Sequence, residues 1–288
     1  MRLRWAVTTL RSSRPLDRLR EEVRGTAPLP ALSGERYALT HAAYEAASDQ
    51  RPRLEAWLAR ELPPLLAGID PVRVVGVGVG DGTVDAVLAA ALASDGRRVH
   101  YTGVEPHAAS AVGFAGRLAA LAVSALIPTV VIGDFADHDA GAPADLVHFV
   151  HSLYYVDDLS AALDHALSMV RPGGLLVAAT APLEPLCVLT ELLCPWGGHR
   201  PWFAGDVRAE LDLRGLDVRA ETLVGHLDVR DALLGGGEDV LDFLVGARTS
   251  AMEPQVRAQM LDYLRDISLS GSVGVVPHPL DLTIARIP

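Results

Sequence analysis

The chain has 288 residues, half of them hydrophobic, and its 36 acidic and 25 basic side chains give a formal net charge of −11. This length allows one domain with a large core plus an appendage. An acidic chain without a basic cluster binds phosphate backbones poorly, and no apolar run reaches transmembrane length, so we expect a cytoplasmic protein without nucleic-acid or membrane partners.

The first 70 residues predict a helical lid. Proline and glycine punctuate residues 1–35, a composition typical of a mobile flap. Residues 36–47 and 52–68 have the amphipathic pattern of two helices, and the polar residues 48–50 mark the break between them.

A glycine-rich segment follows the first predicted strand. The strand begins at Val72, and an alanine-rich helix is predicted over residues 86–93. Between them Gly78, Gly80 and Gly82 carry no side chain, so the main chain can approach a ligand closely. Open α/β sheets bind nucleotide-like cofactors at such a turn. The alternative is a glycine-rich turn with no ligand.

The glycine spacing indicates which cofactor binds. A dinucleotide fingerprint that starts at Gly78 needs a glycine at position 83, where Thr83 stands. A pyrophosphate would also meet the carboxylate of Asp81, and no neighbouring Lys or Arg relieves that repulsion. The pattern G-x-G-x-G instead suits a ligand without phosphates, such as S-adenosylmethionine (SAM), whose carboxylate is favoured near a helix N-terminus.

The next two predicted strands end in residues that suit the rest of this ligand. Residues 98–105 end in Glu105, which can accept hydrogen bonds from both ribose hydroxyls, although an ordinary surface carboxylate is the alternative. Residues 127–133 lead to Asp134 and Phe135, which are candidates to hydrogen-bond and flank an adenine.

The alternation of strands and helices continues. A fourth strand over residues 145–150 leads to His151, and a helix over 159–170 leads to a fifth strand over 175–180. This order predicts an α/β fold with a doubly wound, mostly parallel, seven-stranded sheet. Later elements are predicted as helices at 206–213, 238–245 and 254–266 and as strands within 215–224 and 279–287. The predicted domains are an N-terminal helical lid (1–70), a SAM-binding core (71–181) and substrate-cap insertions with the last strands (182–288).

Three stretches carry a family resemblance, namely residues 76–85, 104–106 and 151–156. With further similar segments at 36–37, 57–63, 227–232 and 239–244, the chain resembles the class I SAM-dependent methyltransferases, and among them the small-molecule enzymes typified by histamine N-methyltransferase. The resemblance implies that SAM is the cofactor. No metal site is expected, because the two cysteines, Cys187 and Cys194, lack a nearby pair of histidines. It implies SAM contacts at Gly78, Glu105, Ser110, Asp134 and Val150, with His151 beside the transferring methyl group.

Two positions depart from this resemblance. Gln50 stands where the family has the acid that contacts the substrate amine, and His278 stands where it has an asparagine that holds the substrate. Histamine is therefore not the expected substrate. An aromatic pocket carries over instead, although each ring can equally be core packing. Its candidate residues are Tyr37, Tyr154, Tyr155, Trp196, Trp202 and Phe243.

These observations predict a SAM-dependent methyltransferase, monomeric or homodimeric, that acts on an N or O atom of a small molecule in secondary metabolism. His151 is the candidate catalytic base, with a pocket-wall role as the alternative. His148 lies three positions earlier on the same strand and therefore faces the other side, which predicts a structural role. A SAM-binding enzyme that catalyses cyclisation or rearrangement is a second hypothesis. The glycine spacing disfavours a third, a nicotinamide oxidoreductase.

Overall fold

The computed structural model describes residues 14–196 and 200–288, and the chain divides into two compact units. The helical unit comprises Met1–Ser48, Pro185–Gly197 and His226–Pro277, and the sheet unit comprises Asp49–Glu184, Gly198–Gly225 and His278–Pro288. Both units are discontinuous in sequence, and each is described by itself. The functional division into lid, core and cap remains a prediction.

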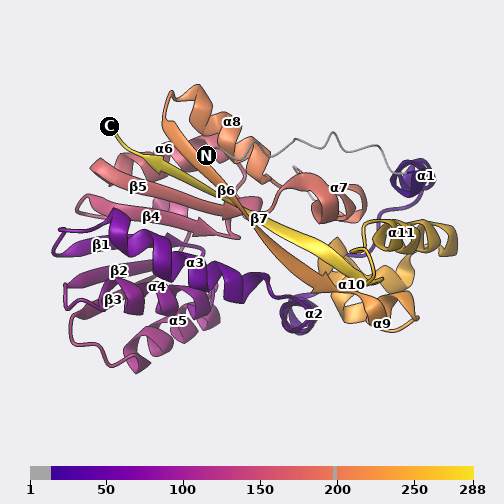
Figure 1. The fold of residues 1–288 in the computed structure, drawn as a ribbon, viewed down its shortest axis with the longest axis horizontal. Coiled ribbons are helices and arrows are strands. Elements are labelled where there is room, and N and C mark those ends of the chain that lie inside the picture. The colour runs from indigo at the N-terminus through magenta and orange to yellow at the C-terminus, as the bar shows by residue number, and fades with distance from the viewer. Residues whose placement is uncertain (1–13, 197–199) are drawn as a thin grey trace. The chain divides into compact units, whose positions relative to one another are not determined.

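The predicted seven-stranded sheet is confirmed. Its strand order is β3-β2-β1-β4-β5-β7-β6, in which β1 to β5 pair in parallel and β7 pairs antiparallel with β5 (Figure 1). The strands are β1 (Val72–Val77), β2 (Val99–Glu105), β3 (Leu126–Ile132), β4 (Ala144–Val150), β5 (Val170–Thr180), β6 (Asp217–Asp228) and β7 (Val275–Arg286).

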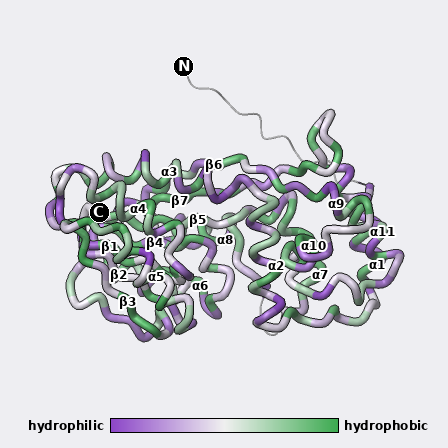
Figure 2. Tube along the Cα trace, turned by 90° about the horizontal axis from the view of Figure 1, so that it is seen from below, coloured by the Kyte–Doolittle hydropathy of each residue, from purple (hydrophilic) through white to green (hydrophobic). Residues whose placement is uncertain are grey.

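Helices cover both faces of this sheet. One hydrophobic cluster joins the strands to α3 (Gln50–Leu65), α4 (Thr83–Leu92) and α5 (Ala108–Ala120). A second cluster joins the opposite face to α6 (Leu159–Met169) and α8 (Ala204–Leu213). Because the central strands are covered on both sides, they are nearly continuous apolar runs (Figure 2).

Short helical turns follow two of the strands and lie at the carboxyl edge of the sheet. They are η1 (Phe135–Asp137) after β3 and η2 (Leu153–Tyr155) after β4. α6 then begins at Leu159 because Asp158 caps it: the Asp158 carboxylate accepts a hydrogen bond from the Ala161 N–H, which the first helical turn leaves unpaired.

A polar cluster lies inside the sheet unit under the glycine-rich turn. The Tyr101 hydroxyl lies 2.8 Å from the Asp85 carboxylate and 2.7 Å from Nε2 of His148, and all three side chains are buried. Burial, together with the charge of Asp85 and the hydrogen bond to it, raises the pKa of Tyr101 well above 10.0. The burial of His148 in this cluster supports its predicted structural role, which stays a prediction.

The helical unit corrects one prediction. Residues 14–23 of the expected flap form helix α1 (Arg14–Val23), whose buried Leu16 and Leu19 are explained by its packing against α11. Residues 1–13 of that flap lie outside the described residues. The other elements are α2 (Gly34–Ala46), η3 (Leu183–Cys187, which begins in the sheet unit), α7 (Val188–Leu193), α9 (Arg230–Leu233), α10 (Glu238–Val245), η4 (Thr249–Ala251) and α11 (Pro254–Asp266).

An ion pair between a partly exposed arginine and a buried carboxylate joins two helices of this unit. Arg36 of α2 donates to the carboxylate of Asp242 of α10 at 2.8 Å, and the other oxygen of Asp242 accepts hydrogen bonds from Thr249.

Among the described residues, no helix combines the length and apolar character needed to cross a bilayer.

Candidate functional site

The glycine-rich turn leaves β1 at Val77 and enters α4 at Thr83. Gly78, Gly80 and Gly82 all have positive φ angles, of 66°, 56° and 76°, which side-chain-bearing residues rarely adopt. A Cβ on Gly78 would collide with Ser152, and one on Gly82 would collide with Phe114. A Cβ on Gly80 would meet no protein atom within 4 Å, so this face of the turn is open.

The Glu105 carboxylate is fixed beside this turn. Its side chain is buried, with 7% exposure, and its two oxygens accept hydrogen bonds from the Gly80 and His107 N–H groups, each at 2.9 Å. Each carboxylate oxygen keeps further lone pairs for a ligand. β2 is the neighbour of β1, and the acid therefore lies next to the glycine-rich turn as predicted.

Asp81 has a basic partner that the local sequence does not reveal. Arg117 of α5 donates to the Asp81 carbonyl at 3.0 Å and to its carboxylate at 2.6 Å. The expectation that no Lys or Arg relieves this charge is therefore wrong, because the partner comes from the next helix along the chain. Asp81 also accepts two hydrogen bonds from Thr83, the first residue of α4.

Burial and hydrogen bonding change the pKa of Asp81 in opposite directions. Burial raises the pKa, but the hydrogen bonds from Thr83 and the charge of Arg117 outweigh burial, and the pKa falls below 3.8. The ionised carboxylate therefore stabilises the turn at pH values above 3.8. This stabilisation is lost as the pH falls through the lower folded-state pKa.

Removal of the Arg117 side chain is expected to weaken SAM binding only slightly. The pair with Asp81 is about half exposed, and such pairs contribute roughly 0–1 kcal/mol. We expect Arg117→Ala to raise the dissociation constant of SAM by at most about fivefold, and less at high salt. Titration calorimetry at two salt concentrations measures this. Arg98→Ala, which breaks the exposed pair with Asp70, is the matched control and should leave the constant unchanged. A loss above tenfold for Arg117→Ala would contradict this estimate.

His151 follows β4 in an unusual backbone conformation. Its φ is 53°, and its N–H donates to the Ala179 carbonyl of β5 at 3.0 Å. Nδ1 of the imidazole lies 3.1 Å from the Tyr154 hydroxyl, which also accepts a hydrogen bond from the Ala181 N–H at 2.6 Å. A residue without glycine's freedom at positive φ stores strain, and such strain is common at functional sites.

The other predicted cofactor residues differ in their local environments. Ser110 lies in the first turn of α5, where its hydroxyl is 3.0 Å from Nδ1 of His107. One oxygen of Asp134 accepts the Ala136 N–H and caps η1. Val150 ends β4 and is half-buried. Phe135 packs between Phe149 and His165 in the core, with ring centroids 5.4 and 4.8 Å away, so its contact with adenine stays a prediction.

Ser152 was not predicted from the sequence. Its side chain indicates whether the site fits SAM. Its Oγ atom is buried and has no hydrogen-bond partner among the described residues, and its side chain packs against Gly78. An unpaired hydroxyl that packs against the glycine-rich turn fits a polar ligand that would provide its partner. The residues that would hold SAM are therefore Gly78–Gly82, Glu105, Ser110, Asp134 and Ser152. The only sequence signal for Ser152 is its position directly after His151.

The predicted substrate residues of the helical unit include an aromatic cluster. Tyr37 of α2 and Phe243 of α10 are in contact, with ring centroids 5.4 Å apart. His41 and Tyr44 also contact Phe243, at 5.0 and 4.8 Å, and were missed. Their spacing of four and seven residues after Tyr37 is that of one helix face, which is the signal for them. The Trp196 indole N–H donates to the Thr190 carbonyl at 3.4 Å.

The predicted substrate residues of the sheet unit have different roles. Gln50 is buried, and its amide nitrogen donates to the carbonyls of His278 and Pro279 at 3.0 and 3.1 Å. The His278 side chain is also buried. Trp202 donates to the Val156 carbonyl at 2.8 Å, whereas Tyr155 is 60% exposed. The assignment of these residues to one pocket stays a prediction.

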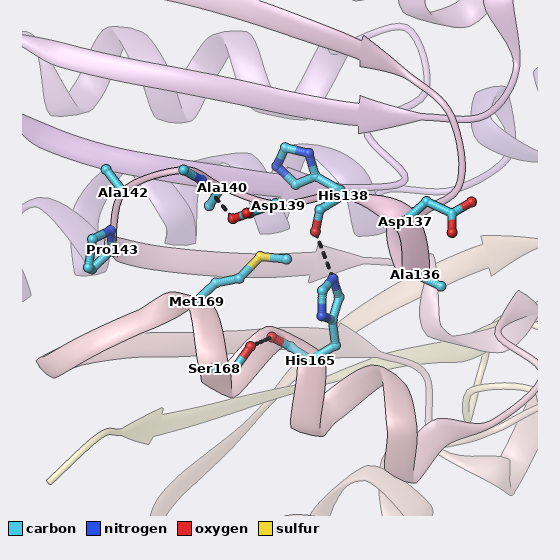
Figure 3. Close-up of a pocket in the computed structure, with 11 residues that line it drawn as sticks. Ala136, Asp137, His138, Asp139, Ala140, Ala142, Pro143, His165, Ser168 and Met169 are labelled. Atoms are coloured by element: carbon cyan, nitrogen blue, oxygen red, sulfur yellow. Dashed lines mark hydrogen bonds between the residues drawn. The ribbon is translucent and has the colours of Figure 1, made fainter.

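A cavity of about 520 Å³ lies beside η1 and the end of α6 (Figure 3). The His165 ring points toward the segment after η1, and its Nε2 lies 2.9 Å from the His138 carbonyl (Figure 3). The His138 ring points away from His165, on the other side of the His138 backbone (Figure 3). Burial lowers the pKa of His138. The lining contains none of the predicted cofactor residues, so this cavity is separate from the glycine-rich turn.

Comparison with known proteins agrees with this geometry. Residues 41–221 match the family model described as a methyltransferase domain. No curated protein matches the chain. A candidate methyltransferase from Bacillus halodurans is 15% identical, with a TM-score of 0.56, and the alignment covers 80% of this chain and 98% of that one.

Two further solved structures share the fold over most of the chain. Magnesium protoporphyrin IX methyltransferase from Synechocystis, with S-adenosylhomocysteine (SAH) bound, is 15% identical with a TM-score of 0.51, and the alignment covers 94% of this chain and 93% of that one. A candidate sarcosine dimethylglycine methyltransferase from Galdieria sulphuraria is 14% identical with the same TM-score, covering 94% and 98%. With the family match over more than half of its length and the seven-stranded sheet described above, the chain belongs to the methyltransferase domain family and is a class I SAM-dependent methyltransferase.

Proposed function

We propose that the enzyme transfers the methyl group of SAM to a nitrogen or oxygen atom of a small molecule. The observation that carries the proposal is the position of three features on neighbouring strands: Glu105 ends β2, the glycine-rich turn ends β1 and His151 follows β4. The net charge of −11 disfavours a nucleic-acid substrate. Two fold neighbours are named for small-molecule substrates, which agrees with the proposal without carrying it.

The chain's own residues would bind and orient the reactants. Bound SAM supplies a methyl group that its sulfonium already activates. The main chain of Gly78–Gly82 and the carboxylate of Glu105 would hold the cofactor, and His151 would orient or deprotonate the acceptor. Orientation alone can contribute roughly 7 kcal/mol or more when the reacting atoms are held close and aligned.

Specificity for histamine is not part of this proposal. The acid that would anchor a histamine-like amine is replaced by Gln50, whose amide nitrogen donates to the backbone carbonyls of His278 and Pro279 in β7. This side chain therefore ties α3 to β7. An amine substrate would need a different anchor.

The release of SAH in the presence of paired amines and alcohols tests the proposal. Methyl transfer requires one SAH for each methylated product, and mass spectrometry identifies the methylated atom. Product formed without SAH release would contradict methyl transfer and support the cyclisation or rearrangement hypothesis.

Substitution of His151 is expected to slow turnover without weakening SAM binding. Loss of one oriented hydrogen bond of about 1.4 kcal/mol reduces turnover roughly tenfold, so His151→Ala should lose at least that much. His151→Gly should lose as much activity but unfold at a higher temperature than His151→Ala, because glycine relieves the strain at φ 53°. Initial rates, SAM titration and thermal unfolding of both variants measure these effects. Unchanged turnover in both would show that His151 is only part of the pocket wall.

A further inference from the structure

A chain of hydrogen bonds reaches the His151 imidazole from the backbone after β5. The Ala181 N–H donates to the Tyr154 hydroxyl at 2.6 Å, and this hydroxyl lies 3.1 Å from Nδ1 of His151. The two rings are nearly parallel, at 28° with centroids 6.0 Å apart. All three residues belong to the sheet unit.

The direction of one bond in this chain is fixed, and the direction of the other depends on the tautomer of His151. A backbone N–H can only donate, so the Tyr154 oxygen is an acceptor toward Ala181. A phenol has one proton to donate, and Nδ1 of His151 lies within hydrogen-bond distance of it. In the tautomer that lets the phenol donate its proton to Nδ1, this nitrogen is the acceptor. In the neutral imidazole the proton is then carried by Nε2.

The backbone holds the imidazole in this arrangement. His151 has a φ of 53° and donates its N–H to the Ala179 carbonyl of β5. Tyr154 accepts the N–H of Ala181, which follows the last residue of β5. Both ends of the hydrogen-bond chain are therefore attached to β5 or to the residue directly after it. Strained conformations of this kind persist only where the surrounding structure determines them. Tyr154 was predicted as a substrate-contacting ring, but its hydroxyl faces His151 and Ala181.

We infer that Tyr154 is a positioning residue that keeps the His151 proton on Nε2, so that His151 acts as a hydrogen-bond donor and the methyl acceptor is a neutral amine. The inference about the acceptor rests on the proposed function. With its proton on Nε2, neutral His151 offers no lone pair at that atom to remove a proton from an alcohol or phenol. The Nε2–H instead orients an acceptor atom elsewhere on the substrate.

The reaction balances without a base in the transfer step. The amine lone pair forms the new N–C bond while the C–S bond of the sulfonium breaks, and the bonding pair stays on sulfur, which leaves neutral SAH. The product nitrogen carries the positive charge and loses its proton to water afterwards. Turnover of alcohols or phenols at rates comparable with amines would contradict this assignment of the acceptor.

Nitrogen-15 NMR of the full chain with labelled histidine, saturated with SAH at a pH where imidazole is neutral, tests the inference without requiring turnover. The His151 signals are identified by their absence in His151→Gln. We expect a protonated, pyrrole-type shift at Nε2 and a pyridine-type shift at Nδ1. In Tyr154→Phe the two shifts should converge, because Nδ1 loses its donor and both tautomers become populated. Tyr155→Phe removes a neighbouring hydroxyl and should leave the spectrum unchanged.

A pyrrole-type shift at Nδ1 of the wild-type protein would overturn the inference, and so would identical His151 shifts in Tyr154→Phe. If Tyr154→Phe fails to fold, the wild-type spectrum alone decides. Absence of methyl transfer to every tested small molecule would refute the proposed function while leaving this spectrum to decide the role of Tyr154.

Discussion

Gly80→Val is expected to abolish SAM binding in a chain that still folds. A Cβ at this position meets no protein atom within 4 Å, so the added side chain can fill only the space on the open face of the turn, where we place the cofactor. We expect the dissociation constant of SAM to rise at least about 100-fold, which corresponds to ~2.8 kcal/mol. Titration calorimetry measures the binding, and circular dichroism measures the fold.

The backbone strain of this substitution needs its own control. Gly80 has a φ of 56°, and a valine there costs about 1–3 kcal/mol, less than the roughly 5–15 kcal/mol by which proteins are stable. Gly96 has a φ of 85°, has equally open surroundings and precedes β2 at the opposite edge of the sheet. Gly96→Val should therefore lose similar stability and keep its SAM affinity. Unchanged SAM affinity in Gly80→Val would show that the cofactor does not lie against this turn.

Glu105→Gln is expected to weaken SAM binding by about 10- to 100-fold. Hydrogen bonds to a charged carboxylate contribute roughly 1.5–3 kcal/mol each, and the neutral amide forms weaker ones with the ribose hydroxyls. The amide also has only one acceptor oxygen, whereas Gly80 and His107 both present N–H donors. One of these donors then faces an NH₂ group, so the free energy of unfolding should fall by about 1–3 kcal/mol as well.

Asp145→Asn separates the two effects of that substitution. Asp145 is another buried carboxylate that accepts a backbone N–H, from Arg73 at 2.7 Å, and it also pairs with Arg171. It lies at the start of β4, at the opposite edge of the sheet from Glu105. This variant should be destabilised while its SAM affinity remains that of the wild type. Equal losses of affinity in both variants would mean that destabilisation, and not ribose binding, explains the result.

The features that could be predicted from sequence depend on local patterns. Alternating glycines after a β-branched strand predicted the turn at Gly78–Gly82. The position of Glu105 at the end of the next strand predicted that its carboxylate lies beside this turn, where it accepts the Gly80 N–H. Parallel strands run in one direction, so their carboxyl ends meet at one edge, and this placed His151 near the same turn. The boundaries of α10 and α11 also agree with their apolar periodicity.

The features that could not be predicted depend on contacts between distant residues. Arg117 lies 36 positions after Asp81, and only the packing of α5 brings the two together. The Tyr154 hydroxyl pairs with a backbone N–H 27 residues later, so its aromatic character suggested substrate contact while its hydrogen bonds remained hidden. α1 was missed because Pro15 lies in its first turn and further proline and glycine residues follow it, a composition that favours irregular structure.

The structure of the full chain crystallised with SAH tests the account most directly. We predict that the ribose hydroxyls lie within hydrogen-bond distance of the Glu105 carboxylate and that the ligand contacts the main chain of residues 78–82. A ligand bound at any other place, with Glu105 paired only to Gly80 and His107, would contradict it.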